Sequence, residues 1–287
     1  MSTTSAQTPS SRRGCLRLIA AAGAAAVVGL PRAAHSAPLS RLRDRGTLKV
    51  GLYGDMPPFH VGGKGIDVEL GEALAESLGL KLAPLPFPAD DNMNDDLRNM
   101  VWRGHYLGYG PADVLLHVPV ERPLMDDNPQ VTIFAPYCRE RVMIARRLDR
   151  VPHLETLSQL GDRAVAVAGL SLAGWLMLGA DDGAYRNQLS THWKDGTEAA
   201  RALKRGDVAA AAGLASELES ELRGDPLYAI SPLPSPRAPR EGWAVGMAVK
   251  RDAGELAEAL AKSVADLIAS GRLQQMFARS NVNWHAA

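Results

Sequence analysis

The sequence predicts an α/β protein built from two similar series of strands and helices. Short runs of β-branched and apolar residues alternate along the chain with segments whose apolar residues recur every three or four positions. Such alternation is typical of parallel or mixed sheets that are covered by helices. Two long extended segments interrupt the alternation, and they divide it into two series.

The first series begins at residue 46. Residues 46–53 form a predicted strand, and the two prolines within 55–59 follow it in a rigid loop. Apolar residues spaced along one helix face predict a helix over 66–78, ended by Gly79. The remaining predicted elements are a strand over 81–87, a helix over 95–106 and a strand over 112–118.

The second series begins after Pro152. A predicted strand over 163–169 ends in glycine, and Ser171 is the expected N-cap of the next helix. A proline-rich passage over 231–239 predicts a rigid connector. The other predicted elements are helices over 196–205 and 216–223 and strands over 208–214 and 227–233.

The two extended segments cover residues 131–147 and 243–249. The clearest helical pattern in the chain follows the second segment and covers residues 254–279. Gly271 lies inside this pattern and is expected to break it into two helices, because glycine is a poor helix former.

Residues 1–36 predict a cleaved export signal. They hold four arginines and no acidic residue, a short apolar run over 18–30, and the small residues Ala34 and Ser36 at the predicted cleavage site. The pair Arg12-Arg13 resembles a twin-arginine motif; the alternative is a general secretory signal with two chance arginines. The apolar run is too short to be a stable membrane anchor. We therefore expect a periplasmic protein.

The balance of charge excludes one class of function. The whole chain has 32 basic and 32 acidic residues, whereas nucleic-acid binders normally show a basic excess. Removal of the four signal arginines leaves 28 basic and 32 acidic residues, a net charge of −4. Cys138 is then the only cysteine, so no disulfide within the mature chain is expected.

Short motifs recur in a recognisable order along the chain: Gly46-Thr-Leu-Lys-Val-Gly51, Pro57-Pro-Phe59, Gly65-Ile-Asp-Val-Glu-Leu70, Phe134-Ala-Pro-Tyr137, Val245-Gly-Met-Ala-Val249 and Asn283-Trp284. This ordered set resembles the family 3 periplasmic solute-binding proteins, which include receptors of ABC transporters. This resemblance implies the type II periplasmic-binding-protein fold, in which two α/β lobes are joined by two extended hinge crossings. It places residues 37–140 and 241–287 in lobe 1 and residues 141–240 in lobe 2.

The resemblance also implies a non-catalytic function without a cofactor or metal. A small-molecule ligand would bind in the cleft between the lobes and be enclosed by hinge closure. Arg122 matches the arginine with which amino-acid receptors hold the ligand carboxylate, and a guanidinium suits that role. The alternative is a surface arginine paired with Glu121 or Asp126. An ABC permease is the partner that such a receptor implies.

The resemblance suggests further cleft residues. His117 occupies the place of a family serine or threonine, with a structural histidine as the alternative, and Ser171 replaces a threonine at a helix start. Asp55, Phe59 and Trp175 are additional candidates, each with a loop or core alternative.

One departure from the family pattern bears on the ligand. Amino-acid receptors place an acidic residue near position 214 to hold the ligand ammonium, whereas residues 209–214 here are apolar. An uncompensated ammonium is costly in a closed cleft. The sequence therefore favours an anionic or neutral solute, with Glu217 and Glu219 as substitutes in the following helical run.

Two other functions remain open. Residues 97–119 resemble the J-type binding proteins associated with PQQ-dependent methanol and alcohol dehydrogenases, which implies an accessory of a periplasmic quinoprotein dehydrogenase or its cytochrome c. A dehydratase on the same fold is the least favoured, since it needs an acidic group in the cleft. The acidic stretch 90–96 lacks the glycine and final acid of a calcium loop, so a helix-capping loop is favoured.

Overall fold

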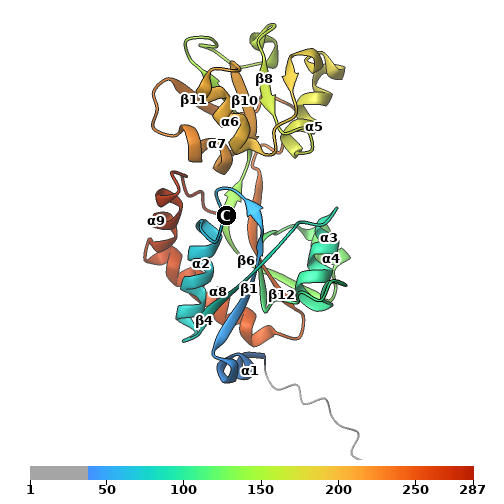
Figure 1. Cartoon of the computed structure of the whole chain (residues 1–287), viewed down its shortest axis with the longest axis vertical. Helices are drawn as coiled ribbons and strands as arrows, with labels where there is room; N and C mark the ends of the chain where they lie inside the picture. Colours follow the sequence, from blue (N-terminus) through green and yellow to red (C-terminus); the bar gives the residue numbers. More distant parts are fainter. Residues whose placement is uncertain (1–37) are drawn as a thin grey trace, which may run out of the picture. The chain divides into compact units, whose positions relative to one another are not determined.

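The structure is a computed structural model that describes residues 38–287, so the predicted export signal lies outside the described residues. Within 38–287 the chain forms two five-stranded mixed sheets with helices packed against both faces of each (Figure 1). This arrangement confirms the α/β class predicted from the sequence. None of the helices described between residues 38 and 287 is long and apolar enough to span a membrane.

The first sheet has the strand order β4-β1-β5-β12-β6. Strand β1 pairs in parallel with β4 and β5, whereas β12 pairs antiparallel with β5 and β6. The carboxyl ends of β1, β4 and β5 therefore lie along one edge of this sheet. Their bounds are β1 (Thr47–Tyr53), β4 (Lys81–Phe87), β5 (Val114–Pro119), β6 (Val131–Glu140) and β12 (Trp243–Lys250).

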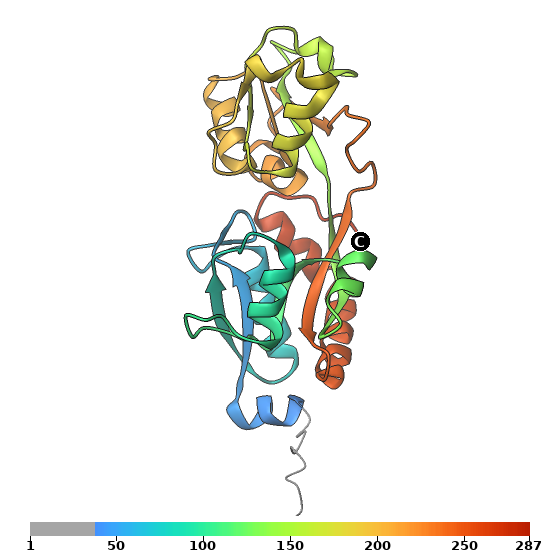
Figure 2. The same ribbon diagram turned by 90° about the vertical axis from the view of Figure 1, so that its right-hand side faces the viewer.

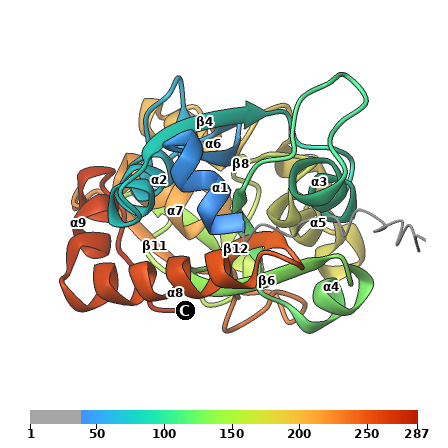
Figure 3. The same ribbon diagram turned by 90° about the horizontal axis from the view of Figure 1, so that it is seen from below.

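Helices bury both faces of the first sheet. Residues of α2 (Ile66–Ser77), α8 (Gly254–Ala269) and α9 (Arg272–Arg279) share one core with the sheet. The opposite core includes α3 (Met93–Leu97), the π-helical turn η1 (Arg98–Trp102) and α4 (Arg122–Asp127). Figure 3 shows α2, α8 and α9 apart from α3 and α4. Helix α1 (Pro38–Arg45) precedes β1.

The second sheet has the order β11-β7-β10-β8-β9. Strands β8, β9 and β10 are parallel, and β7 is antiparallel to β10 and β11. Helix α5 (Leu172–Gly179) packs in one core, and α6 (Gly196–Arg205) and α7 (Ala215–Leu222) pack in the other. The strands are β7 (Val142–Arg147), β8 (Val165–Val167), β9 (Leu189–Ser190), β10 (Ala210–Leu214) and β11 (Tyr228–Pro232).

Short elements complete the described chain. They are the hairpin strands β2 (Asp55–Met56) and β3 (His60–Val61) and the 3₁₀ turns η2 (Leu157–Leu160), η3 (Ala180–Gly183) and η4 (Arg186–Gln188).

The two predicted extended segments connect the sheets. Residues 131–147 form two strands separated only by Arg141, with β6 in the first sheet and β7 in the second. Strand β12 returns the chain from β11 of the second sheet to the first. Gly242, which precedes β12, has a φ of 64°, a conformation that glycine adopts without strain.

Some element lengths differ from the predictions. The helix expected over 95–106 is α3 followed by η1, which ends at Trp102. Gly104, Gly108 and Gly110 then adopt positive φ, and the resulting loop shortens the helix. The predicted break at Gly271 is confirmed, because this glycine has a φ of 73° between α8 and α9.

Candidate functional site

The candidate site residues belong to the ends of parallel strands or to the segments that follow them. Asp55 follows β1, while His117 lies within β5 and Arg122 begins α4 just beyond it. In the second sheet, Ser171 follows β8 and Leu214 ends β10. Ligands of open α/β sheets bind beyond the carboxyl ends of parallel strands, so these segments are the candidate ligand-binding region.

Asp67, His117 and Tyr137 form a buried polar network in the first lobe. The Tyr137 hydroxyl donates to the Asp67 carboxylate at 2.8 Å and accepts from the His117 backbone N–H at 3.2 Å. Asp67 is 2% exposed and Tyr137 is fully buried. Burial and the nearby Asp67 charge raise the pKa of the Tyr137 phenol well above its usual range, so the phenol remains a hydrogen-bond donor.

His117 is held in an uncommon backbone conformation, with a φ of 61°. Its Nδ1 atom is 3.3 Å from Asp67 Oδ2 but has no hydrogen-bond partner in the described chain. The imidazole also contacts the Phe59 ring at 4.2 Å between centroids. The structure thus brings together two of the predicted site residues, although Phe59 and His117 are only 2% and 7% exposed.

Glu140 is a second buried acid, at the last position of β6. One of its carboxylate oxygens, Oε2, is buried without a hydrogen-bond partner in the described residues. Burial raises the pKa of Glu140, while the neighbouring Ser216 of α7 opposes that rise. Glu140 of the first sheet therefore lies beside a helix of the second.

Glu217 changes the chemistry expected at the end of β10. Its carboxylate accepts the backbone N–H groups of Leu214 at 2.7 Å and Gly196 at 3.1 Å. A Cβ at Gly196 would lie 2.2 Å from Glu217 Oε2, so the glycine leaves room for the carboxylate. The strand is apolar as expected, and the first turn of α7 places Glu217, one of the two acids considered as substitutes, beside Leu214.

Burial raises the pKa of Glu217 from 4.5 to about 7. The folded state consequently holds this proton more tightly than the unfolded chain does. Its contribution to stability is complete below pH 4.5 and is lost as the pH rises through about 7. We expect the unfolding free energy of the wild type, relative to Glu217→Gln, to fall by up to about 3 kcal/mol over this range.

Urea unfolding at several pH values would measure this difference. Glu258→Gln on the exposed face of α8 is the matched control, and its difference from the wild type should not follow the same curve. A Glu217→Gln difference that stays constant between pH 4.5 and 8 would contradict the expected titration.

Contacts join residues of the two lobes. Asp55 forms an ion pair with Lys194, the residue two positions before α6. This pairing is the main cause that raises the pKa of Lys194. After α9, the Asn281 side chain donates to the Glu219, Ser220 and Arg223 carbonyls at the end of α7.

Arg122 lies at the surface of the described structure. Its side chain is 84% exposed and its Nε atom is 3.1 Å from Asp126 Oδ1, one helical turn later. This is the ion pair considered in the alternative interpretation. The exposed guanidinium also remains accessible to a carboxylate, so its role in binding stays a prediction.

Ser171 and Trp175 lie at the start of α5. Ser171 accepts the Gly174 N–H at 3.1 Å, which confirms it as the N-cap, and its hydroxyl donates to the Ala168 carbonyl at 2.7 Å. Trp175 is 71% exposed, and Leu170 and Leu172 beside it are 97% and 43% exposed. This end of α5 therefore offers apolar surface that a ligand or the opposite lobe can cover.

The acidic stretch 90–96 forms a helix-capping loop. Asn92 accepts the Asp95 N–H at 3.1 Å, and buried Asp96 accepts the Tyr53 hydroxyl at 2.9 Å. Burial raises the pKa of Asp96 to about 6. Among residues 38–287, no three histidine, cysteine or acidic side chains are grouped to hold a metal.

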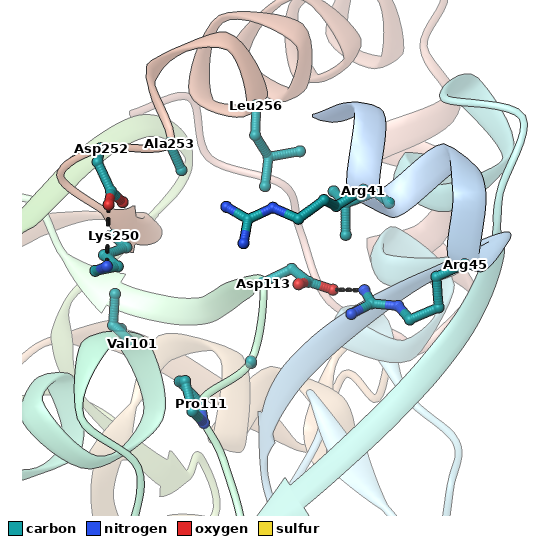
Figure 4. Close-up of a pocket in the computed structure, with 11 residues that line it drawn as sticks. Arg41, Arg45, Val101, Pro111, Asp113, Lys250, Asp252, Ala253 and Leu256 are labelled. Carbon is teal, nitrogen blue, oxygen red and sulfur yellow. Dashed lines mark hydrogen bonds and ion pairs between the residues drawn. The ribbon is translucent and has the colours of Figure 1, made fainter. Parts of the chain in front are cut away.

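A pocket of about 270 Å³ lies beside α1, next to the starts of β1 and β5 rather than their ends (Figure 4). Arg41 extends into it, while Arg45 pairs with Asp113 and Lys250 pairs with Asp252 at 3.0 Å. Both carboxylates of the lining are thus already engaged.

Several residues at the candidate site were not singled out from the sequence. Asp67 and Tyr137 each belong to a motif of the family resemblance, the first in Gly65–Leu70 and the second in Phe134–Tyr137. Neither motif reveals that the two side chains are partners, because they are 70 residues apart in the chain. Lys194 lies in a short irregular segment without a motif.

Comparisons with known proteins place this fold among solute-binding proteins. The sequence matches no family model and no curated protein. An ancestral cationic amino-acid solute-binding protein aligns with a TM-score of 0.66 and 18% identity, covering 84% of this chain and 98% of that one.

Two receptors from bacteria align similarly. The substrate-binding protein of an amino-acid ABC transporter from Streptococcus pneumoniae, bound to L-arginine, has a TM-score of 0.60 and 17% identity and covers 87% and 100% of the two chains. The L-cystine receptor of Neisseria gonorrhoeae, unliganded and open, has a TM-score of 0.60 and 19% identity and covers 87% and 99%. Another ancestral amino-acid-binding protein is described as a precursor of cyclohexadienyl dehydratase; it covers 85% and 99% at 18% identity and a TM-score of 0.56. These likenesses show the two-lobed solute-binding-protein fold.

Proposed function

We propose that this chain is an exported solute-binding protein that encloses a small molecule between two lobes by hinge closure. Lobe 1 comprises residues 37–140 and 241–287, and lobe 2 comprises residues 141–240. Residues 1–36 are the signal that directs the chain to the periplasm, where an ABC permease is the partner that receives the solute.

The arrangement of β6, β7 and β12 carries this proposal. The chain passes between the two sheets along adjacent extended strands, and only Arg141 separates β6 from β7. Rotation about a few residues at such connections moves two lobes as rigid bodies. The Asp55–Lys194 pair is exposed, so it offers little resistance to such motion.

The ligand that fits best is a small carboxylate-bearing solute. The exposed guanidinium of Arg122 supplies two charge-assisted hydrogen bonds to a carboxylate. Amino acids are the first class to test, because the neighbouring receptors bind arginine or cystine. Trp175 and Leu170 suit an apolar part of the ligand.

A thermal-shift panel of amino acids and small carboxylates tests this proposal, since a ligand that binds only the folded state raises the melting temperature. We expect Arg122→Ala to weaken the binding of the responding ligand by about tenfold or more, with little effect on the ligand-free protein. The matched control is Lys262→Ala on α8, which removes an equally exposed pair with Asp266. Equal weakening in both variants would rule out Arg122 as the anchor.

Other outcomes favour the alternative functions. No response to the panel, together with retention of a periplasmic quinoprotein dehydrogenase or its cytochrome c, would replace the transport role by an accessory role. Conversion of prephenate would establish a dehydratase, for which the raised pKa of Glu217 is the supporting observation. However, the backbone N–H groups of Gly196 and Leu214 both donate to the Glu217 carboxylate, which favours a structural role for this side chain.

A further inference from the structure

A second pocket lies beside both connections between the sheets. Its volume is about 580 Å³, and its walls come from the start of β7, from Leu154 and Glu155, and from residues 231–236 and 238–240. Figure 2 shows the irregular segment after β11, in orange, leading into β12. The lining includes Arg141, which separates β6 from β7, and Arg240, three positions before β12 begins at Trp243. The pocket therefore lies beside both crossings.

The walls of this pocket are apolar and rigid. Three largely buried core residues form part of the lining: Val142, Leu154 and Leu233. Pro232, Pro234, Pro236 and Pro239 fix the backbone of the outer wall, because each ring locks φ and removes an N–H donor. A preformed cavity of this size is suited to a small ligand.

Two arginines give the pocket a cationic end. The Arg141 Nε atom is buried without a hydrogen-bond partner, and no ion pair within residues 38–287 engages Arg141 or Arg240. The absence of a side chain at Gly242 leaves room for the aliphatic part of the Arg141 side chain, because a Cβ at Gly242 would be 2.7 Å from Arg141 Cγ. The lining contains one carboxylate, Glu155, against the two guanidinium groups.

We infer that this pocket is a second binding site, distinct from the space between the lobes, and that it takes a small amphipathic carboxylate. Arg141 and Arg240, two guanidinium groups of the lining without an ion pair in the described chain, bind the carboxylate through charge-assisted hydrogen bonds. The aliphatic or aromatic body of the ligand packs against Val142, Leu154, Leu233 and the proline wall. A cationic ligand would meet two like charges and is disfavoured.

Isothermal titration with octanoate tests the assignment, with octanamide as the uncharged analogue. We expect saturable octanoate binding to the wild type that is weakened at least about tenfold in Arg240→Gln and in Arg141→Gln. Arg251→Gln removes the same charge from an exposed position after β12 and should bind as the wild type does. Octanamide should bind more weakly than octanoate to the wild type, and the two Gln variants should lose this preference.

Arg122→Ala separates this site from the proposed ligand site between the lobes. If octanoate binds in the second pocket, whose lining does not include Arg122, the Arg122→Ala variant should bind octanoate with unchanged affinity. Loss of octanoate binding in Arg122→Ala but not in Arg240→Gln would overturn the inference, and so would the absence of saturable binding by the wild type. Arg240 is exposed, so urea unfolding should show that Arg240→Gln is as stable as the wild type. Weaker octanoate binding by this variant would then result from the lost guanidinium and not from partial unfolding.

Discussion

Replacing Gly242 with alanine is expected to destabilise the protein by at least about 4 kcal/mol. A Cβ at this position would lie 1.8 Å from the Glu140 carbonyl oxygen and 2.7 Å from Arg141 Cγ. Both neighbours belong to the other crossing, and the backbone of one crossing must move to relieve the contact. Because φ is 64°, a side chain here also adds backbone strain. Urea unfolding of Gly242→Ala measures the loss.

Two glycine controls separate the causes of this loss. Gly224 has a φ of 85° and nothing near its missing Cβ, so Gly224→Ala should cost only about 1–2 kcal/mol of backbone strain. Gly254 begins α8 with open space and ordinary φ, so Gly254→Ala should change stability by less than about 0.5 kcal/mol. Equal losses of unfolding free energy in Gly242→Ala and Gly224→Ala would show that the two crossings move apart at no measurable cost and that no steric clash remains.

Asp67→Ala is expected to cost about 3 kcal/mol. It removes the acceptor of the buried Tyr137 hydroxyl and the carboxylate that faces His117 Nδ1 at 3.3 Å. A buried donor without a partner destabilises the folded state by the full cost of its desolvation, because no hydrogen bond offsets that cost. The hydrogen bond is also charge-assisted, which places it among the stronger ones. Denaturant unfolding at neutral pH gives the free-energy change.

Tyr137→Phe tests the cause of that cost. The phenyl ring fills the same space without the hydroxyl, so the orphaned donor disappears. We expect Asp67→Ala and Tyr137→Phe to be less than additive by about 1 kcal/mol or more in the double variant. Strict additivity would mean that the 2.8 Å contact contributes nothing to stability and that Asp67 acts only through its volume.

Much of the secondary structure could be predicted from local sequence patterns. The helix predicted over 66–78 is α2, and the pattern over 254–279 is α8 and α9 on either side of Gly271. The predicted helix over 95–106 failed after Trp102, because three glycines at positive φ form a loop that helix periodicity does not reveal. Helix α4 was missed because its six residues are too few to show a periodic pattern.

The candidate site was less accessible to sequence reasoning. Ser171 was recognised as an N-cap because capping depends on neighbours a few residues away. Whether residues 209–214 lack an acidic partner depends instead on where α7 begins. Glu217 reaches back to Leu214 and also across to Gly196, which lies 21 residues earlier in the chain.

The sequence by itself determined the α/β class, the two series of elements and the extended segments that connect them. These follow from hydrophobic periodicity and from proline and glycine, whose effects extend over a few residues. Only the tertiary structure decided that Asp67 bonds to Tyr137, that Glu140 and Glu217 are buried acids, and that Arg141 lines a pocket with Arg240. Those features depend on packing between segments that are distant in the chain, where burial and desolvation are set by the fold as a whole.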